Sequence, residues 1–304
     1  LDGLPMVMMP IITGVGFLIH LYATGYMSDD PSFARFFSYM NLFVSAMLML
    51  VLGDNLVLLY LGWEGVGLCS YLLIGFWYTN PTNGYAARKA FVVTRVGDTS
   101  MAIGLFLLFA QLGTLNIQDM LHAAEMQWSA SSGFAVAASL LLLGGAVGKS
   151  AQLPLQTWLP DAMAGPTPIS ALIHSSTMVT AGVYLIARTH PLFEMAPSVQ
   201  LLVALIGLVT LLLSGFTAMT QSDIKRILAY STVSQIGYMF LGLGVGAWSA
   251  AIFHLMTHAF FKALLFLASG TVILSLHHEQ NIFKMGGLRK ALPVSFFSFL
   301  IGSL

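Results

Sequence analysis

Residues 133–163 read GFAVAASLLLLGGAVGKSAQLPLQTWLPDAM. The stretch is longer than the roughly 20 mostly apolar residues that a membrane-spanning helix needs. Sixteen uncharged residues precede Lys149, and Pro154 and Pro160 follow it, so the helical ladder is interrupted directly after an ionisable side chain. Unwound backbone at membrane depth is tolerated only beside protein or water-filled cavities, and transporters place ion sites there. The stretch therefore predicts a broken transmembrane helix with Lys149 at the break. A simple proline kink is the alternative.

The rest of the chain has the composition of an integral membrane protein. Of its 304 residues, 57% are hydrophobic and 8% are charged, whereas a soluble domain carries roughly 25% charged residues. This composition predicts an all-α integral membrane protein, a multi-span helical bundle. The connector at 113–132 is expected to form an amphipathic surface helix. Further apolar runs fall at about 4–27, 36–53, 55–78, 85–112, 166–189, 197–220, 223–246 and 248–276, and another begins near 291.

The basic residues predict how the chain is oriented. If each run crosses the membrane once, successive connectors alternate between the two sides. One side then receives only Arg188, and the lysine- and arginine-rich side is expected to be cytoplasmic. The residues on that side are Arg35, Arg88, Lys89, Lys225, Arg226, Lys284, Arg289 and Lys290.

Other global features exclude several functions. The formal net charge is zero, which gives no indication of a nucleic-acid partner. The single cysteine, Cys69, excludes disulfides and CxxC metal sites within the chain. Because the sequence starts at Leu1 and stops at Leu304 inside an apolar stretch, it is expected to be a segment of a longer protein.

Three ionisable residues inside spans are the main candidates for function. Glu64, Lys149 and Lys262 each lie within an apolar run, where a charge costs at least ~2.5–3.5 kcal/mol on insertion scales. A buried amine changes its protonation state when a carboxylate approaches or withdraws, so a Glu64–Lys149 pair could act as a proton switch. The alternatives are a protonated Glu64 that hydrogen-bonds a neighbouring helix, and a Lys149 that snorkels to the interface.

Histidines and a second charge pair support this interpretation. His254, His258 and Lys262 are spaced i, i+4 and i+8, so they share one helical face and suggest a hydrated path. The HxxxH spacing could instead bind metal, or the histidines could be satisfied in a core without a role. His174 has a near-neutral ordinary pKa that suits proton relay. Arg95 and Asp98, spaced i, i+3, are expected to pair with each other and to have a mainly structural role in holding helices together.

The sequence lacks the motifs of an energy-converting enzyme. It has no Rossmann GxGxxG after a strand, no Walker loop, no GxSxG and no haem or iron–sulfur ligand set. Any ion movement must therefore be driven from outside the chain.

Five stretches together resemble one family. They are LYLGWEGVGLCSYLL at 59–73, GKSAQLPLQTWLPDAM at 148–163, PTPISALIH at 166–174, KRILAYS at 225–231 and HLMTHAFFKAL at 254–264. They are similar to the antiporter-like subunits of proton-pumping NADH:quinone oxidoreductase, respiratory complex I, and to related subunits of multisubunit cation/proton antiporters. HHEQNI at 277–282 and KMGGL at 284–288 resemble the L-type branch of the bacterial complex.

The resemblance implies roles for the matched residues. Glu64 and Lys149 would be the coupled pair of a first half-channel, and Lys262 the central relay lysine. His174, His254 and His258 would line the hydrated axis, with Arg95, Asp98 and Lys225 in support. The family also implies inverted five-helix repeats. These would divide the chain into an N-terminal span and connector at 1–35, a first repeat at 36–196, and a second repeat at 197–304 that stops before its own broken helix.

The resemblance also implies a function and its setting. The chain would translocate protons as a non-redox subunit of NADH:quinone oxidoreductase, and the alternative is a subunit of a multisubunit Na⁺/H⁺ antiporter. It would hold no cofactor, because NADH, flavin, iron–sulfur clusters and quinone would bind partner subunits. Its partners would be other membrane-arm subunits and the lipid bilayer, in the cell inner membrane of a bacterium.

Overall fold

The protein is described by a computed structural model that covers residues 2–304. Its elements are helical, with short 3₁₀ turns between some of them. The helices are α1 (Gly3–Tyr26), α2 (Phe33–Leu52), α3 (Leu56–Ile74), α4 (Pro81–Leu112), α5 (Ile117–Gln127), α6 (Gly133–Lys149), α7 (Thr167–Ser175), α8 (Ala181–Arg188), α9 (His190–Glu194), α10 (Pro197–Ala218), α11 (Ile224–Gly244), α12 (Trp248–Ser275) and α13 (Pro293–Ser303).

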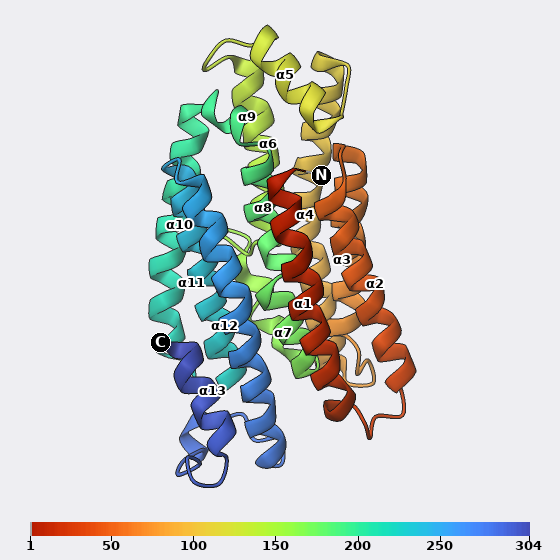
Figure 1. Cartoon of the computed structure of the whole chain (residues 1–304), viewed down its shortest axis with the longest axis vertical. Helices are drawn as coiled ribbons and strands as arrows, with labels where there is room; N and C mark the ends of the chain where they lie inside the picture. Colours follow the sequence, from red (N-terminus) through yellow and green to blue (C-terminus); the bar gives the residue numbers. More distant parts are fainter. Residues whose placement is uncertain (1) are drawn as a thin grey trace.

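The long helices run side by side along the long axis of the molecule (Figure 1). Within residues 2–304, seven helical segments are long and apolar enough to cross a membrane, with α7 and α8 counted as one segment. Helix α6 is shorter, at 17 residues. Helix α11 has 21 residues but a more polar composition, with Lys225 and Arg226 in its first turn. The prediction of a multi-span helical bundle is confirmed.

Polar caps fix where several helices begin. The side-chain oxygen of Asn55 accepts a hydrogen bond from the backbone N–H of Leu58 at the start of α3. Asp223 accepts from the N–H groups of Lys225 and Arg226 at the start of α11. These side chains satisfy backbone donors that have no partner inside the helix. Each cap therefore sets a helix boundary at one end of the bundle.

Glycines bring neighbouring helices into close contact. A Cβ on Gly62 of α3 would lie 2.5 Å from the backbone nitrogen of Leu50 on α2. A Cβ on Gly97 of α4 would lie 2.7 Å from the carbonyl oxygen of Gly144 on α6. Small residues are typical of such close packing between transmembrane helices. The first contact joins α2 to α3, and the second joins α4 to α6 next to Lys149.

The expected break after Lys149 is present. Helix α6 ends at Lys149, and residues 150–166 continue as turns with two short 3₁₀ segments before α7 begins. The backbone N–H of Leu153 in this stretch bonds the Thr210 hydroxyl of α10 at 3.2 Å, so protein covers the unwound chain. A simple proline kink within a continuous helix is therefore excluded.

The predicted span over 166–189 is present, but its helix is not continuous. This span is interrupted between α7 and α8, where Thr177 adopts φ −124° and ψ −106°. The Thr177 hydroxyl bonds the carbonyl of Leu172 at 2.5 Å, and the Thr180 hydroxyl bonds the carbonyl of Thr177 at 2.8 Å. Hydroxyls that bond the local backbone compete with helical hydrogen bonds. The apolar window of this span is fully buried, which permits irregular backbone at membrane depth.

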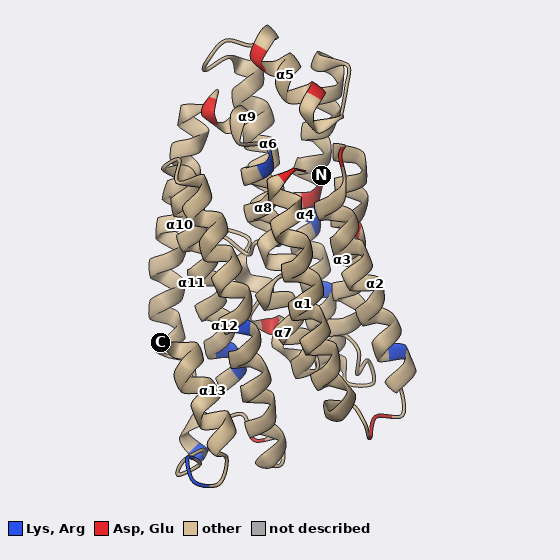
Figure 2. Cartoon of the chain, in the orientation of Figure 1, with Lys and Arg blue, Asp and Glu red and all other residues tan. Residues whose placement is uncertain are grey.

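The ends of the bundle differ in charge. Helix α5 lies across one end and buries one face through Ile117, Met120, Leu121 and Ala124, as expected for the amphipathic connector. Figure 2 shows several acidic residues at this end, and several basic residues towards the opposite end, where the connector before α13 lies. The connectors therefore alternate between the two ends as the sequence predicted.

Candidate functional site

Lys149 is buried at the end of α6. The residue is 1% exposed, and its Nζ is 3.1 Å from Oδ2 of Asp98 on α4. Gly67 of α3 leaves room for the ammonium group, because a Cβ there would lie 2.6 Å from Nζ. The break in the chain after Lys149 ends the helix with this amine directed into the bundle rather than towards an interface. The snorkelling alternative is therefore wrong.

Asp98 is held between an ammonium group and an indole. It is 1% exposed, and the Trp63 indole N–H donates to its Oδ1 at 2.6 Å. Its other oxygen faces Lys149. A buried carboxylate needs such partners, because an unpaired charge in an apolar interior is costly.

Glu64 forms a separate ion pair on the side of the bundle. Its Oε2 lies 2.5 Å from a terminal nitrogen of Arg95, and the Tyr60 hydroxyl donates to its Oε1 at 2.7 Å. The Arg95 guanidinium lies 4.6 Å from the centre of the Phe91 ring. The Glu64 side chain is 20% exposed and that of Arg95 is 42% exposed. This pair thus lies at the surface, whereas the Asp98–Lys149 pair lies inside.

Both predicted charge pairings are wrong. Glu64 pairs with Arg95 rather than with Lys149, and Asp98 pairs with Lys149 rather than with Arg95. The reason is the close contact of α4 and α6 at Gly97, whose missing Cβ would also lie 3.0 Å from Cα of Gly148. That contact places Asp98 beside the residue that follows Gly148. Arg95, one turn earlier on α4, pairs with Glu64 instead.

Lys262 lies in the second half of the chain and has a different environment. It is 1% exposed on α12, and its Nζ donates to the hydroxyl of Ser231 on α11 at 2.7 Å. None of the ion pairs within residues 2–304 includes Lys262. The two central lysines therefore differ, since one is paired with a carboxylate and the other with a neutral hydroxyl.

The histidines divide into two kinds. His174 and His258 are fully buried, and neither ring nitrogen of either residue has a hydrogen-bond partner in the described chain. The His174 ring lies 4.8 Å from that of Phe266, one helical turn beyond Lys262. His254 is only partly buried, and its Nε2 is 2.7 Å from the side-chain oxygen of Gln235.

These environments decide between the alternatives for the histidines. His254 is satisfied within the protein, so a structural role accounts for its contacts. His174 and His258 are not, and buried polar atoms without a protein partner are normally satisfied by water. Ser170, Ser175 and Ser176 on the α7 side also have buried hydroxyls without a partner among residues 2–304. This set of polar atoms fits a hydrated path beside Lys262.

The sequence missed a polar cluster at the basic end. Lys225 was expected in a connector and in a supporting role, and the structure shows it 2% exposed, with its Nζ donating to the carbonyls of Met163 and Gly165 at 2.7 and 2.8 Å. Asp161 pairs with Lys89 at 2.6 Å and with Arg226 at 3.1 Å. The prolines around 154–168 were the available signal. A proline-rich segment leaves carbonyls without helical partners.

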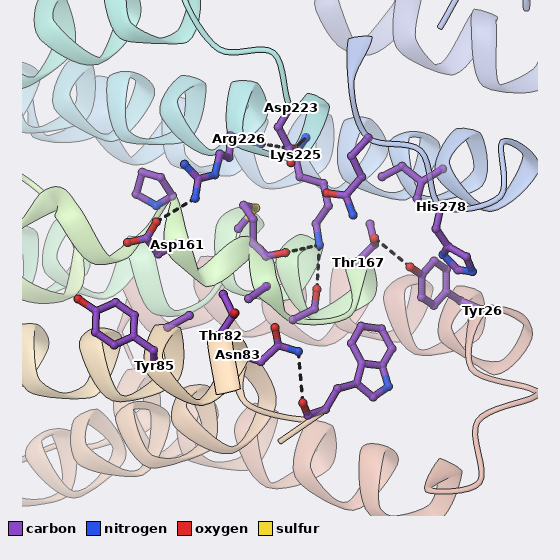
Figure 3. Close-up of a pocket in the computed structure, with 18 residues that line it drawn as sticks. Tyr26, Thr82, Asn83, Tyr85, Asp161, Thr167, Asp223, Lys225, Arg226 and His278 are labelled. Carbon is purple, nitrogen blue, oxygen red and sulfur yellow. Dashed lines mark hydrogen bonds and ion pairs between the residues drawn. The ribbon is translucent and has the colours of Figure 1, made fainter. Parts of the chain in front are cut away.

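This cluster lines a cavity of about 520 Å³ that opens between α1, α4, α11 and the segment before α7. Figure 3 shows Lys225 directed at the carbonyls of that segment, and Asp161 beside Arg226 on the other side of the same cavity. Thr167, the first residue of α7, also lines the cavity and bonds the Tyr26 hydroxyl at 3.2 Å. The cavity therefore reaches the start of the helix that carries Ser170 and His174.

The arrangement is that of a polytopic helical membrane protein with a polar axis buried inside the bundle. Buried amines, imidazoles and hydroxyls lie inside the bundle on several helices, and a polar cavity opens at one end. Within residues 2–304, no group of three or more His, Cys, Asp or Glu side chains is placed to hold a metal ion.

Comparison with known proteins identifies the family. Residues 53–304 match the family described as NADH:quinone oxidoreductase/Mrp antiporter, transmembrane, and residues 1–37 match the N-terminus of chain 5 of NADH-ubiquinone oxidoreductase (complex I). The chain belongs to this NADH:quinone oxidoreductase/Mrp antiporter family.

The curated relatives agree with this assignment. The chain is 68% identical over 302 residues to NADH-quinone oxidoreductase subunit L of Escherichia coli (strain K12), covering 99% of this chain and 49% of that protein. It is 56% identical over 301 residues to subunit L of Mycobacterium tuberculosis (strain H37Rv), covering 98% of this chain and 47% of that one. The chain thus spans about half the length of the curated relatives it matches.

Solved structures share the fold. The Mrp complex from Dietzia sp. DQ12-45-1b superposes with a TM-score of 0.86 at 36% identity, over 90% of this chain and 30% of that one. The membrane-bound sulfane sulfur reductase, an archaeal respiratory membrane complex, superposes with a TM-score of 0.85 over 98% of this chain and 61% of that one. Its identity of 24% supports the fold alone.

Proposed function

We propose that this chain translocates protons across the membrane as a non-redox subunit of an NADH:quinone oxidoreductase. The observation that carries the proposal is the buried Asp98–Lys149 ion pair at the end of a broken helix. A purely structural role explains this pair poorly, because charges inside a membrane are energetically costly and usually mark ion pathways. The similarity to subunit L of other bacteria supplies the setting of the complex.

The two lysines would carry the proton in turn. Lys149 would hold a proton while Asp98 is adjacent, and a shift of Asp98 or of Glu64 on the neighbouring helix would change the electric field at that amine. Lys262, paired only with Ser231, would take the proton next. Water held by His174 and His258 would connect Lys262 with the cavity at the basic end. Glu64, Arg95, Asp98, Lys225 and His254 would then support the relay rather than carry the proton themselves.

Contacts at the two ends support the proposed inverted repeats at 36–196 and 197–304. Asn55, at the start of α3, forms an isolated antiparallel bridge with Asn116, and Asp223, at the start of α11, forms one with Asn281. The first bridge lies at the α5 end and the second at the opposite end (Figure 1). The same contact at opposite ends is the relation that an inverted repeat predicts.

The partial exposure of the Glu64–Arg95 pair supports the proposal that another protein covers it in the membrane. A guanidinium that is 42% exposed at mid-span is expensive in lipid, so a second membrane subunit would cover this face of α3 and α4. NADH, flavin, iron–sulfur clusters and quinone would bind in partner subunits. The basic end would face the cytoplasm of a bacterial cell, with the chain in the inner membrane.

A sodium/proton antiporter subunit is the second candidate. The structural similarity to the Mrp complex favours it, because the family model that matches this chain names the Mrp antiporter as well as NADH:quinone oxidoreductase. NADH-driven proton uptake that persists without sodium would argue for the oxidoreductase, whereas sodium-dependent uptake without NADH would argue for the antiporter.

The test is NADH-driven proton uptake in membrane vesicles with Lys149→Ala in the full-length subunit. We expect uptake and quinone-linked turnover to collapse while NADH oxidation by an artificial acceptor persists, since that reaction reports assembly. Lys284→Ala is the matched control, because Lys284 is 67% exposed in the connector before α13. Normal uptake with Lys149→Ala would contradict the proposed relay.

A further inference from the structure

Two aromatic donors on one turn of α3 each hold one of the two carboxylates. The Trp63 indole N–H bonds Oδ1 of Asp98 at 2.6 Å, and the Tyr60 hydroxyl bonds Oε1 of Glu64 at 2.7 Å. Trp63 is fully buried, whereas Tyr60 is partly exposed. The two donors thus serve the inner and the outer ion pair separately.

We propose that Trp63 is a positioning residue that assigns Asp98 to Lys149. Two cations are candidates to pair with Asp98. They are Arg95, one turn earlier on α4, and Lys149 on α6. By holding Oδ1, the indole leaves Oδ2 as the oxygen that meets Lys149 at 3.1 Å. The effect of this positioning on transport rests on the proposed proton relay.

The geometry of α3 explains how one helix contacts both ion pairs, Asp98–Lys149 and Glu64–Arg95. Trp63 and Glu64 are consecutive, and consecutive helical residues point in directions about 100° apart. Trp63 therefore faces the bundle interior while Glu64 faces the side where Arg95 lies. Tyr60 and Glu64 are four residues apart and share one face, which places the hydroxyl on the Glu64 carboxylate.

The bond from Trp63 is strong enough to decide the pairing. A hydrogen bond to an ionised carboxylate is stronger than one between neutral groups and gains further strength in a buried site. Its loss changes an equilibrium between two arrangements by about tenfold or more. Without the indole donor, Asp98 is free to rotate towards Arg95, and Lys149 loses its partner for part of the time.

The test is Trp63→Phe, which keeps an aromatic ring and removes only the donor and part of the ring volume. In the assembled complex with the full-length subunit, we expect the infrared carboxylate bands of Asp98 to shift. Those bands are identified by their loss in Asp98→Asn. NADH-driven proton uptake should fall about tenfold. Trp248→Phe is the control, because the Trp248 indole donates to the carboxylate of Glu194 at 3.0 Å at the exposed end of α12.

A double-mutant cycle separates positioning from simple packing. If Trp63 acts through Asp98, Trp63→Phe adds no further loss in the Asp98→Asn background. An equal loss in both backgrounds, or unshifted Asp98 bands, overturns the proposal. If the bands shift but uptake stays normal in Trp63→Phe and in Asp98→Asn, Trp63 positions Asp98 as inferred and the proton relay itself is wrong.

Discussion

Alanine substitutions at two glycines of α3, Gly62 and Gly67, should affect stability and proton uptake differently. In Gly67→Ala the new methyl group would meet the flexible end of Lys149, 2.6 Å away, so the ammonium moves from Asp98 while the helices stay in place. We expect folding to be nearly unchanged and proton uptake to fall strongly. In Gly62→Ala the methyl group meets the backbone of α2 at 2.5 Å. Overpacking there should destabilise the protein by about 1–3 kcal/mol.

Thermal unfolding in detergent and proton uptake in vesicles distinguish the two effects. Gly14→Ala on α1 is the control, because nothing lies within 4 Å of a Cβ at that position. A Gly67→Ala protein with normal uptake would show that the ammonium position does not matter. If Gly67→Ala is as unstable as Gly62→Ala, then the Lys149 side chain cannot move aside to make room for the new methyl group.

At the scale of elements, Lys225 should fasten the unwound segment before α7. Lys225→Met leaves the buried carbonyls of Met163 and Gly165 without their donor, and an unsatisfied buried group costs about 1–3 kcal/mol. We therefore expect faster amide hydrogen exchange at 156–167. Arg226→Met removes only the half-exposed pair with Asp161, and exposed pairs contribute about 0–1 kcal/mol. Equal exchange in the two variants would contradict this role of Lys225.

At the scale of the whole molecule, the charge difference between the ends predicts orientation. Ser28→Cys lies in the connector between α1 and α2, and Ala130→Cys lies after α5 at the other end; both positions are exposed. The only native cysteine, Cys69, is buried and should not react. We expect a membrane-impermeant thiol reagent to label Ala130→Cys in intact cells and Ser28→Cys only in inverted vesicles. The reverse pattern would show that the basic end is external.

The bundle and its candidate charges were predictable because they depend on local composition. Apolar runs gave the spans, and Lys149 before two prolines gave the break after α6. The second break, between α7 and α8, was not predicted. It depends on hydroxyl bonds of Thr177 and Thr180 inside a fully buried segment, and the sequence alone does not distinguish these from ordinary helical threonines.

The multi-span helical bundle and the ionisable residues inside its apolar runs could be predicted from the sequence alone. Each of these follows from residues close together in the chain, whose transfer free energies decide whether a segment enters lipid. Which carboxylate pairs with which cation depends instead on how the helices pack in three dimensions. Asp98 lies 35 residues from Trp63 and 51 residues from Lys149. Their contact depends on the glycine-mediated packing of α3, α4 and α6, which places Lys149 beside Asp98 and leaves Arg95 to Glu64.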